Sequence, residues 1–146
     1  SGSEDSMYDG MDIALCVISP VVNGMKLSFS GALRPLWIMR EGSNEMEEIT
    51  PTSGTIGGFT PVDQEYPTYI IHLKKGDVFY LFTDGYIDQF GGELDRKFGL
   101  RRLNEILTSV HKMPMAKQQK ELELCIDNWR GNNLQLDDML IIGVRV

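Results

Sequence analysis

The segment DVFYLFTDGYIDQFGGELDRKFG, residues 77–99, is where the pattern of this 146-residue chain changes. It opens with VFYLFT, a run of apolar and aromatic residues that is typical of a buried strand. The run stops at Thr83-Asp84-Gly85, and more acids and glycines follow it. A strand that we expect to be buried therefore delivers a carboxylate at its end, next to a glycine that allows the chain to turn.

Short strands separated by turns are predicted before this segment. Residues 11–19 are almost continuously apolar, which indicates a central strand. The dipeptide Asn23-Gly24 predicts a hairpin turn, because both residues tolerate positive φ. Further strands are predicted at 25–30, in a hairpin over 35–50, at 68–73 and at 78–83. Residues 51–67 contain three glycines and three prolines, which predicts a loop.

Two helices and a last strand are predicted after the segment. Apolar residues recur at helical spacing from Phe98 onward, and again between Pro114 and Gly131. They are Leu103, Ile106, Leu107 and Val110 in the first helix, and Leu122, Cys125, Ile126 and Trp129 in the second. Residues 139–146 predict a closing strand. This order favours an α+β fold, in which helices flank antiparallel β-sheets.

Composition narrows the class of protein. The length suits one domain, and 42% hydrophobic residues are enough for a core. A net charge of −7 argues against binding to nucleic acid or to anionic lipid. Cys16 and Cys125 each lie in an apolar run, which predicts buried free thiols and a cytoplasmic protein. No apolar run is long enough to cross a membrane, so we expect no direct membrane insertion.

Acidic residues mark the ends of two predicted strands. Asp84 follows one strand, and Asp137-Asp138 come just before the last one. If these strands are neighbours, the carboxylates meet at one edge of the sheet, where they repel one another unless a cation lies between them. Hard oxygen ligands select Mg²⁺ or Mn²⁺. The alternative is that Asp-Gly and Asp-Asp simply form turns, and spacing alone leaves both interpretations open.

The same residues resemble a known family. LFTDGYIDQFGG…KFGLRRL, followed by QLDDMLIIGVRV, resembles the metal-dependent protein serine/threonine phosphatases (the PPM family). The resemblance is to the bacterial branch typified by stage II sporulation protein E and the sigma-factor regulatory phosphatases. The segments GALRPLWI, TSGTIGGF and FGLRRLNEIL resemble further family motifs in the same order, with Leu33 where a histidine often stands. The match runs from Met11 to Val146.

The resemblance implies an α/β/β/α sandwich fold and specific roles for the acids. Asp84 and Asp137 would be the catalytic metal ligands and Asp138 a supporting ligand, while the substrate-binding residues stay unassigned. Two Mn²⁺ or Mg²⁺ ions in the intact domain would activate water for hydrolysis of phosphoserine or phosphothreonine on a protein. Asp88 and Glu93 would lie in a flap that contacts substrate or an activator. The alternative for those two is a solvated loop.

One family motif is missing from the chain. The pattern D-x-x-G-H-G, whose aspartate bridges the two metals in the family, does not occur. We therefore expect residues 8–146 to be a phosphatase domain that lacks its N-terminal part and is weak or inactive. Residues 1–7 are expected to be a disordered lead-in that begins with a cloning remnant. Asp9 and Asp12 lie in a segment that is structural in the family pattern.

Two other classes of function compete with the enzyme. The chain could be a pseudophosphatase that binds a phosphoprotein, or an interaction domain whose carboxylates only form turns. The resemblance implies bacterial signalling, with a phosphorylated anti-sigma antagonist as substrate and a sensor or signalling domain upstream. A truncated sheet would expose edges and apolar faces, so we also expect that a homodimer can form. His72 and His111 are expected to have structural roles.

Overall fold

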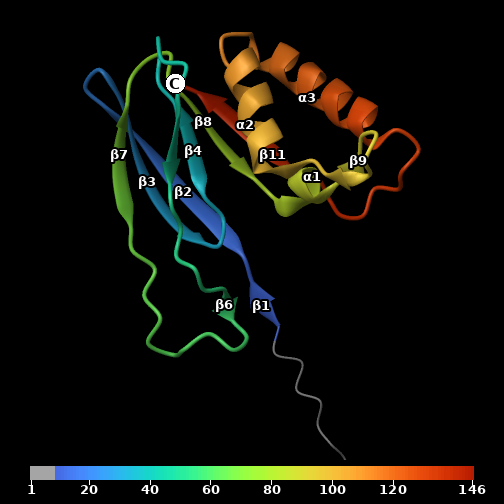
Figure 1. The fold of residues 1–146 in the computed structure, drawn as a ribbon. Coiled ribbons are helices and arrows are strands. Elements are labelled where there is room, and N and C mark those ends of the chain that lie inside the picture. The colour runs from blue at the N-terminus through green and yellow to red at the C-terminus, as the bar shows by residue number, and fades with distance from the viewer. Residues whose placement is uncertain (1–8) are drawn as a thin grey trace, which may run out of the picture.

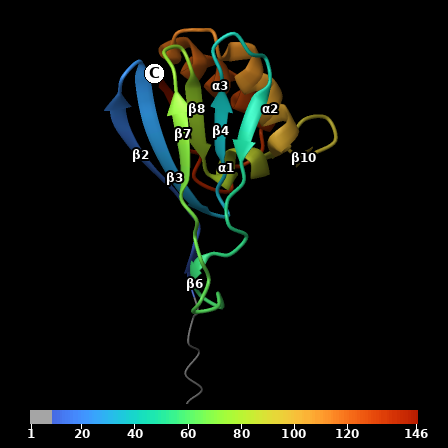
Figure 2. The same cartoon turned by 90° about the vertical axis from the view of Figure 1, so that its left-hand side faces the viewer.

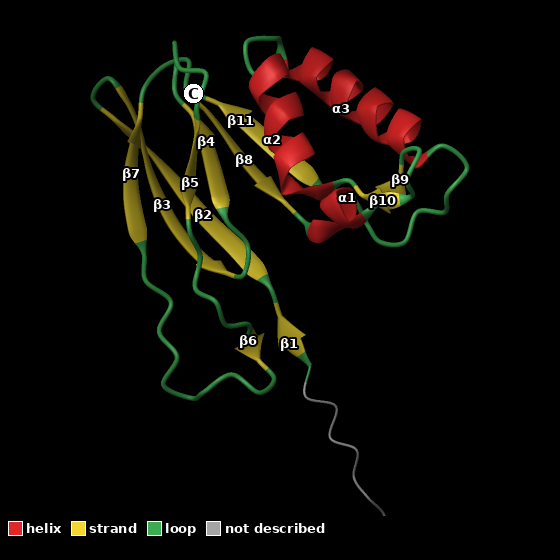
Figure 3. Cartoon of the chain, viewed as in Figure 1, coloured by secondary structure: helices red, strands yellow, loops and turns green. Residues whose placement is uncertain are grey.

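Two antiparallel sheets stack face to face in the computed structural model, which describes residues 9–146, and helices cover one of the sheets (Figures 1 and 3). The strands are β1 Gly10–Met11, β2 Ile13–Val21, β3 Gly24–Ala32, β4 Leu36–Met39, β5 Met46–Ile49, β6 Ile56–Gly57, β7 Tyr69–Leu73, β8 Val78–Phe82, β9 Phe90–Gly91, β10 Arg96–Lys97 and β11 Ile141–Arg145. The helices are α1 Asp84–Asp88, α2 Gly99–Val110 and α3 Met115–Arg130. The prediction for residues 1–7 lies outside the described residues. The predicted α+β class is confirmed.

The four-stranded sheet, in the order β11-β8-β4-β5, lies at the centre of the stack. Successive side chains of a strand point to opposite faces, and here both faces are covered. Trp37 and Tyr80 pack into the core beneath the helices. Ile38 and Phe79 pack against the other sheet. Burial on both faces explains why β4 and β8 are continuous apolar runs in the sequence.

The three-stranded sheet has the order β2-β3-β7, so β2 is an edge strand. The prediction of a central strand at residues 11–19 is therefore wrong for the described structure. Cys16 faces the core between the sheets, whereas Leu15 and Val17 on the opposite face are 56% and 55% exposed. Figure 2 views this face from outside, and the helices lie behind it. An apolar run with one side in solvent cannot be distinguished from a fully buried strand by its pattern alone.

The two long helices form where the apolar spacing predicts them. Pro114 lies immediately before α3, and Gly131 follows it with φ at +55°. Leu122 and Ile126 are buried as predicted, whereas Cys125 is only half-buried. Both cysteines are free, and burial raises the pKa of the Cys16 thiol to about 11. Within residues 9–146, none of the helices combines the length and apolar character needed to cross a membrane.

A buried polar cluster ties the helices to the sheet. The Tyr80 hydroxyl donates to Gln118 Oε1 at 2.8 Å, and Gln118 Nε2 donates to the carbonyl oxygens of His111 and Met113 at 3.1 and 3.0 Å. Arg145 of β11 donates to the same two carbonyl oxygens. The connection between α2 and α3 is thus held by hydrogen bonds from its own layer and from the sheet.

Asp77 holds the turns at the end of the sheet where β8 begins, next to Arg145 of β11. Its side chain is 4% exposed and accepts hydrogen bonds from the backbone N–H groups of Lys74 and Glu41 and from Arg40. Burial acts to raise the pKa of Asp77, but these three donors together outweigh it, so the pKa is lowered. The ionised carboxylate therefore stabilises the turn before β8 and the end of β4.

We expect Asp77→Ala to lower the free energy of unfolding by about 2–3 kcal/mol, because it leaves buried donors without an acceptor. Urea denaturation at pH 7 measures the loss, and the exposed Asp63→Ala is the control. The folded-state pKa of Asp77 lies below the unfolded value, so its contribution is complete above about pH 4 and is lost at lower pH. The stability difference between wild type and Asp77→Asn should shrink over that acid range. A constant difference would contradict this account.

Candidate functional site

The ends of β8 and β11 bring two acidic segments together. The strands are antiparallel neighbours, and Phe82 pairs with Ile141. Asp84 begins α1 just after β8, and residues 137–138 come just before β11, so both segments lie at the same end of the sheet (Figure 1). The sequence left open whether these two strands are neighbours. They are, so the two acidic segments lie at one edge of the sheet.

Backbone contacts fix the two segments against each other. The hydroxyl of Thr83 donates to the carbonyl oxygen of Asp138 and accepts from the N–H of Leu140, both at 3.1 Å. A Cβ atom at Gly85 would lie 2.2 Å from the Asp138 carbonyl oxygen. The glycine predicted to let the chain turn is thus required for close approach of the neighbouring backbone.

Arg34 connects Asp84 to a third acidic residue. It lies between β3 and β4, and its Nη2 is 2.8 Å from Asp84 Oδ2 and 2.6 Å from Asp12 Oδ2. The hydrogen bond from Arg34 is the largest cause of a lowered pKa at Asp84, and burial only partly opposes it. Burial disfavours the charged guanidinium, but Asp84 and Asp12 outweigh it and raise the pKa of Arg34. The result is a cluster in which two carboxylates share one guanidinium.

Asp137 and Asp138 are both exposed. Asp137 Oδ1 accepts a hydrogen bond from the backbone N–H of Asp138 at 2.7 Å, which bends the chain before β11. The backbone carbonyl of Asp138 faces Thr83 and Gly85. The structure therefore brings the segment of Asp137 and Asp138 to the start of α1. It also places Arg34 in contact with Asp84 and Asp12.

The acidic residues around Asp84 offer the oxygen donors that a divalent metal prefers. They do not form a complete metal site within the described part of the chain. Carboxylate and carbonyl oxygens are the ligands that Mg²⁺ and Mn²⁺ prefer. Among residues 9–146, however, no three acidic, histidine or cysteine side chains are close enough together to hold an ion. The positively charged group in contact with Asp84 is Arg34.

The segment after α1 forms a small hairpin, β9–β10. Asp88 pairs with Lys97 at 3.0 Å, and Glu93 is exposed in the connection between the strands. His72 is exposed on β7. His111 is buried after α2, where its Nδ1 lies 2.6 Å from the carbonyl oxygen of Thr108. Within residues 9–146, the hydrogen bonds and ion pairs of these four residues do not reach the cluster around Arg34.

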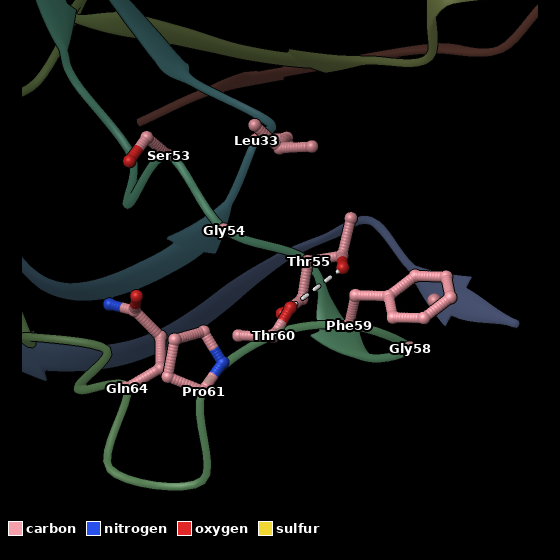
Figure 4. A pocket seen from close by; sticks show the side chains of 10 residues that line it. Leu33, Ser53, Gly54, Thr55, Gly58, Phe59, Thr60, Pro61 and Gln64 are labelled. Atoms are coloured by element: carbon pink, nitrogen blue, oxygen red, sulfur yellow. Dashed lines mark hydrogen bonds between the residues drawn. The ribbon is translucent and has the colours of Figure 1, made fainter. Parts of the chain in front are cut away.

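The loop at 51–67 borders the same region. It forms an open hollow of about 470 Å³ that is lined by loop residues and by Leu33, the residue before Arg34 (Figure 4). The hydroxyl groups of Thr55 and Thr60 are 3.0 Å apart and hold the two sides of the loop together. Its lining mixes polar side chains, such as Ser53 and Gln64, with apolar ones, such as Leu33 and Phe59.

The Arg34 cluster is the part of the site that sequence reasoning missed. Asp12 and Asp84 are 22 and 50 residues from Arg34, so no local pattern links them. The one available signal was that Arg34 lies within GALRPLWI, a segment that resembles a family motif. Asp12, in a segment expected to be structural, lies between β1 and β2 and pairs with Arg34.

Comparison with known families identifies the chain. A family model described as Stage II sporulation protein E (SpoIIE) matches residues 4–146. The chain therefore belongs to the stage II sporulation protein E family, as the order of its motifs indicated. No match is found among curated proteins.

Solved phosphatase domains share the fold. The SiaA-PP2C domain of Pseudomonas aeruginosa is 31% identical, with a TM-score of 0.74, and the match covers 83% of this chain and 46% of that one. The phosphatase domain of SpoIIE from Bacillus subtilis is 14% identical, with a TM-score of 0.62 and coverage of 90% and 57%; a manganese-presoaked form of it also matches. The serine/threonine phosphatase PstP/Ppp of Mycobacterium tuberculosis is 15% identical, with a TM-score of 0.51 and coverage of 89% and 58%. The chain thus spans about half the length of these relatives.

We expect Gly85→Ala to lower the free energy of unfolding by about 1–3 kcal/mol, because the added methyl group meets a backbone oxygen that cannot move aside easily. Gly54→Ala is the matched control, since its Cβ would come no closer than 3.4 Å to a neighbouring side chain. Thermal and urea unfolding of the three proteins measure the effect. Equal stability of the two variants would show that the segments are not tightly fixed.

Proposed function

We propose that this chain is part of a metal-dependent phosphatase domain that removes phosphate from phosphoserine or phosphothreonine on a regulatory protein. The observation that carries the proposal is the pairing of β8 with β11, which fixes Asp84 beside the segment of Asp137 and Asp138. Membership of the stage II sporulation protein E family supports the same reaction. A regulatory protein of the anti-sigma antagonist type, in the bacterial cytoplasm, is the substrate we infer from the family.

The metal ligands we propose are Asp84 and Asp137, with Asp138 in support. Their oxygen donors favour Mn²⁺ or Mg²⁺. Manganese was presoaked into a B. subtilis relative with the same fold, which supports the choice of metal. Divalent ions at such a centre supply positive charge that orients a phosphate group and stabilises the charge that develops during its hydrolysis. In the longer protein, further ligands would come from residues outside this chain.

The proposed phosphatase domain extends beyond this chain. Residues 8–146 would form its C-terminal part, because the chain spans about half of its structural relatives and lacks the D-x-x-G-H-G motif. The exposed face of β2, with Leu15 and Val17, would then pack against the rest of the domain or, in the isolated chain, against a second copy. A sensor or signalling domain upstream would supply the input.

A second candidate function is a pseudophosphatase that binds a phosphoprotein without hydrolysing it. The specific observation in its favour is that Arg34 already pairs with the proposed ligand Asp84. A guanidinium is also a strong ligand for phosphate. The two candidates make opposite predictions for turnover in the longer protein.

In the longer protein, Asp84→Asn and Asp137→Asn should each lower kcat at least about 100-fold, because each removes a charged oxygen ligand from the centre. The fold should persist, since both side chains are at the surface. Phosphopeptide hydrolysis with Mn²⁺ measures the rate, and Asp63→Asn is the control. Full turnover in both variants would remove the ligand assignment, and no turnover in the wild type would favour the pseudophosphatase.

The isolated chain should hydrolyse p-nitrophenyl phosphate or a phosphopeptide weakly or not at all in millimolar Mn²⁺. The reason is that the described residues do not bring three ligand side chains together. The assay is release of phosphate by the purified chain, with the longer protein as the positive control. Rapid turnover that Asp84→Ala abolishes would show that this chain holds a complete centre.

A further inference from the structure

The guanidinium of Arg34 stands where a cation would be expected. One nitrogen, Nη2, donates to both Asp12 and Asp84, at 2.6 and 2.8 Å. Only 20% of the Arg34 side chain is exposed, against 29% for Asp12 and 39% for Asp84. The contact is thus partly shielded from water, which makes charge–charge interactions stronger than at an open surface.

The three residues come from different parts of the fold. Asp12 lies between β1 and β2, Arg34 between β3 and β4, and Asp84 at the start of α1. The register of β2 with β3 pairs Ile13 with Ala32, which brings the chain next to Asp12 close to the segment of Arg34. The fold therefore sets this ion-pair cluster, and no local turn could produce it.

Two carboxylates that share one guanidinium carry a net charge of −1. They still attract a divalent cation, but an ion that binds Asp84 must share the carboxylate with Arg34 or displace it, and it is repelled by the guanidinium charge. Asp84 uses one oxygen, Oδ2, for the Arg34 contact. The arginine thus lowers the affinity of this centre for any ion that needs Asp84.

We propose that Arg34 is the resident cation of this acidic centre and that it competes with divalent metal for the carboxylate of Asp84. The inference deepens the proposed function, since it rests on Asp84 being a metal ligand. Arg34 acts as a positioning residue: it holds Asp84 in a fixed orientation in the absence of metal and sets how readily metal binds. Removing the guanidinium should strengthen metal binding.

The experiment is a titration of the isolated chain with Mn²⁺, in which electron paramagnetic resonance measures the free ion. Arg34→Gln should bind Mn²⁺ at least about fivefold more tightly than wild type, since it removes a positive charge beside Asp84 that repels the divalent ion. Arg101→Gln is the matched control, because it makes the same change of charge at an exposed helical position. The control should stay within about twofold of wild type. Adding Asp84→Asn to Arg34→Gln should abolish the gain.

Circular dichroism and thermal unfolding check that each variant is folded. If Arg34→Gln does not fold, Arg34→Lys takes its place, and it should bind Mn²⁺ at least about twofold more tightly than wild type. A hydrated ammonium on a flexible stem holds two carboxylates less firmly than a guanidinium. Equal or weaker binding by the folded Arg34 variant would overturn the proposal.

The failure of this proposal is distinguishable from failure of the proposed function. If Asp84→Asn alone weakens Mn²⁺ binding while Arg34→Gln leaves it unchanged, Asp84 remains a ligand and only the competition is wrong. If neither wild type nor Arg34→Gln binds Mn²⁺, the competition is wrong as well, and the longer protein then decides whether Asp84 is a ligand at all.

Discussion

The pairing of β8 with β11 is the constraint on which the rest of the site depends. These strands are far apart in the sequence, and their five-residue register fixes how far each one extends. A slip by one residue would turn Tyr80 away from the helices and move Asp84 relative to the segment before β11. The same hydrogen bonds therefore determine the packing of the core and the place where the acidic segments meet.

Charge in the site follows from this geometry. The hydrogen bonds of Thr83 and the close approach at Gly85 bring two acidic segments together although both carry negative charge. Like charges held close together repel one another unless a cation lies near them. Arg34 supplies positive charge at the Asp84 side of this edge, where it pairs with both Asp84 and Asp12. The cluster is thus a consequence of the sheet, and its members could not form it in an unfolded chain.

Local patterns in the sequence were enough to predict most elements of this fold. The 3.6-residue spacing of Leu103 and Leu107 gave α2, and the strand-end positions of Asp84 and Asp137 correctly indicated segments that adjoin. The role of residues 11–19 was not predictable, because an apolar strand looks the same at the edge of a sheet and at its centre. Arg34 was not predictable either, since its partners are set by topology and not by spacing. The burial of Gln118 was not predictable for a related reason, because it depends on Tyr80 as a hydrogen-bond partner.

The shared carbonyl oxygens of His111 and Met113 have a mechanical consequence. Gln118 and Arg145 both donate to them, so the loop joining the two long helices is fastened to the far end of β11. The near end of β11 leads back to the bend at Asp138. If the helical layer tilts or slides, either several of these hydrogen bonds break or β11 moves with the helices. A displacement of β11 would also shift the acidic segment that precedes it.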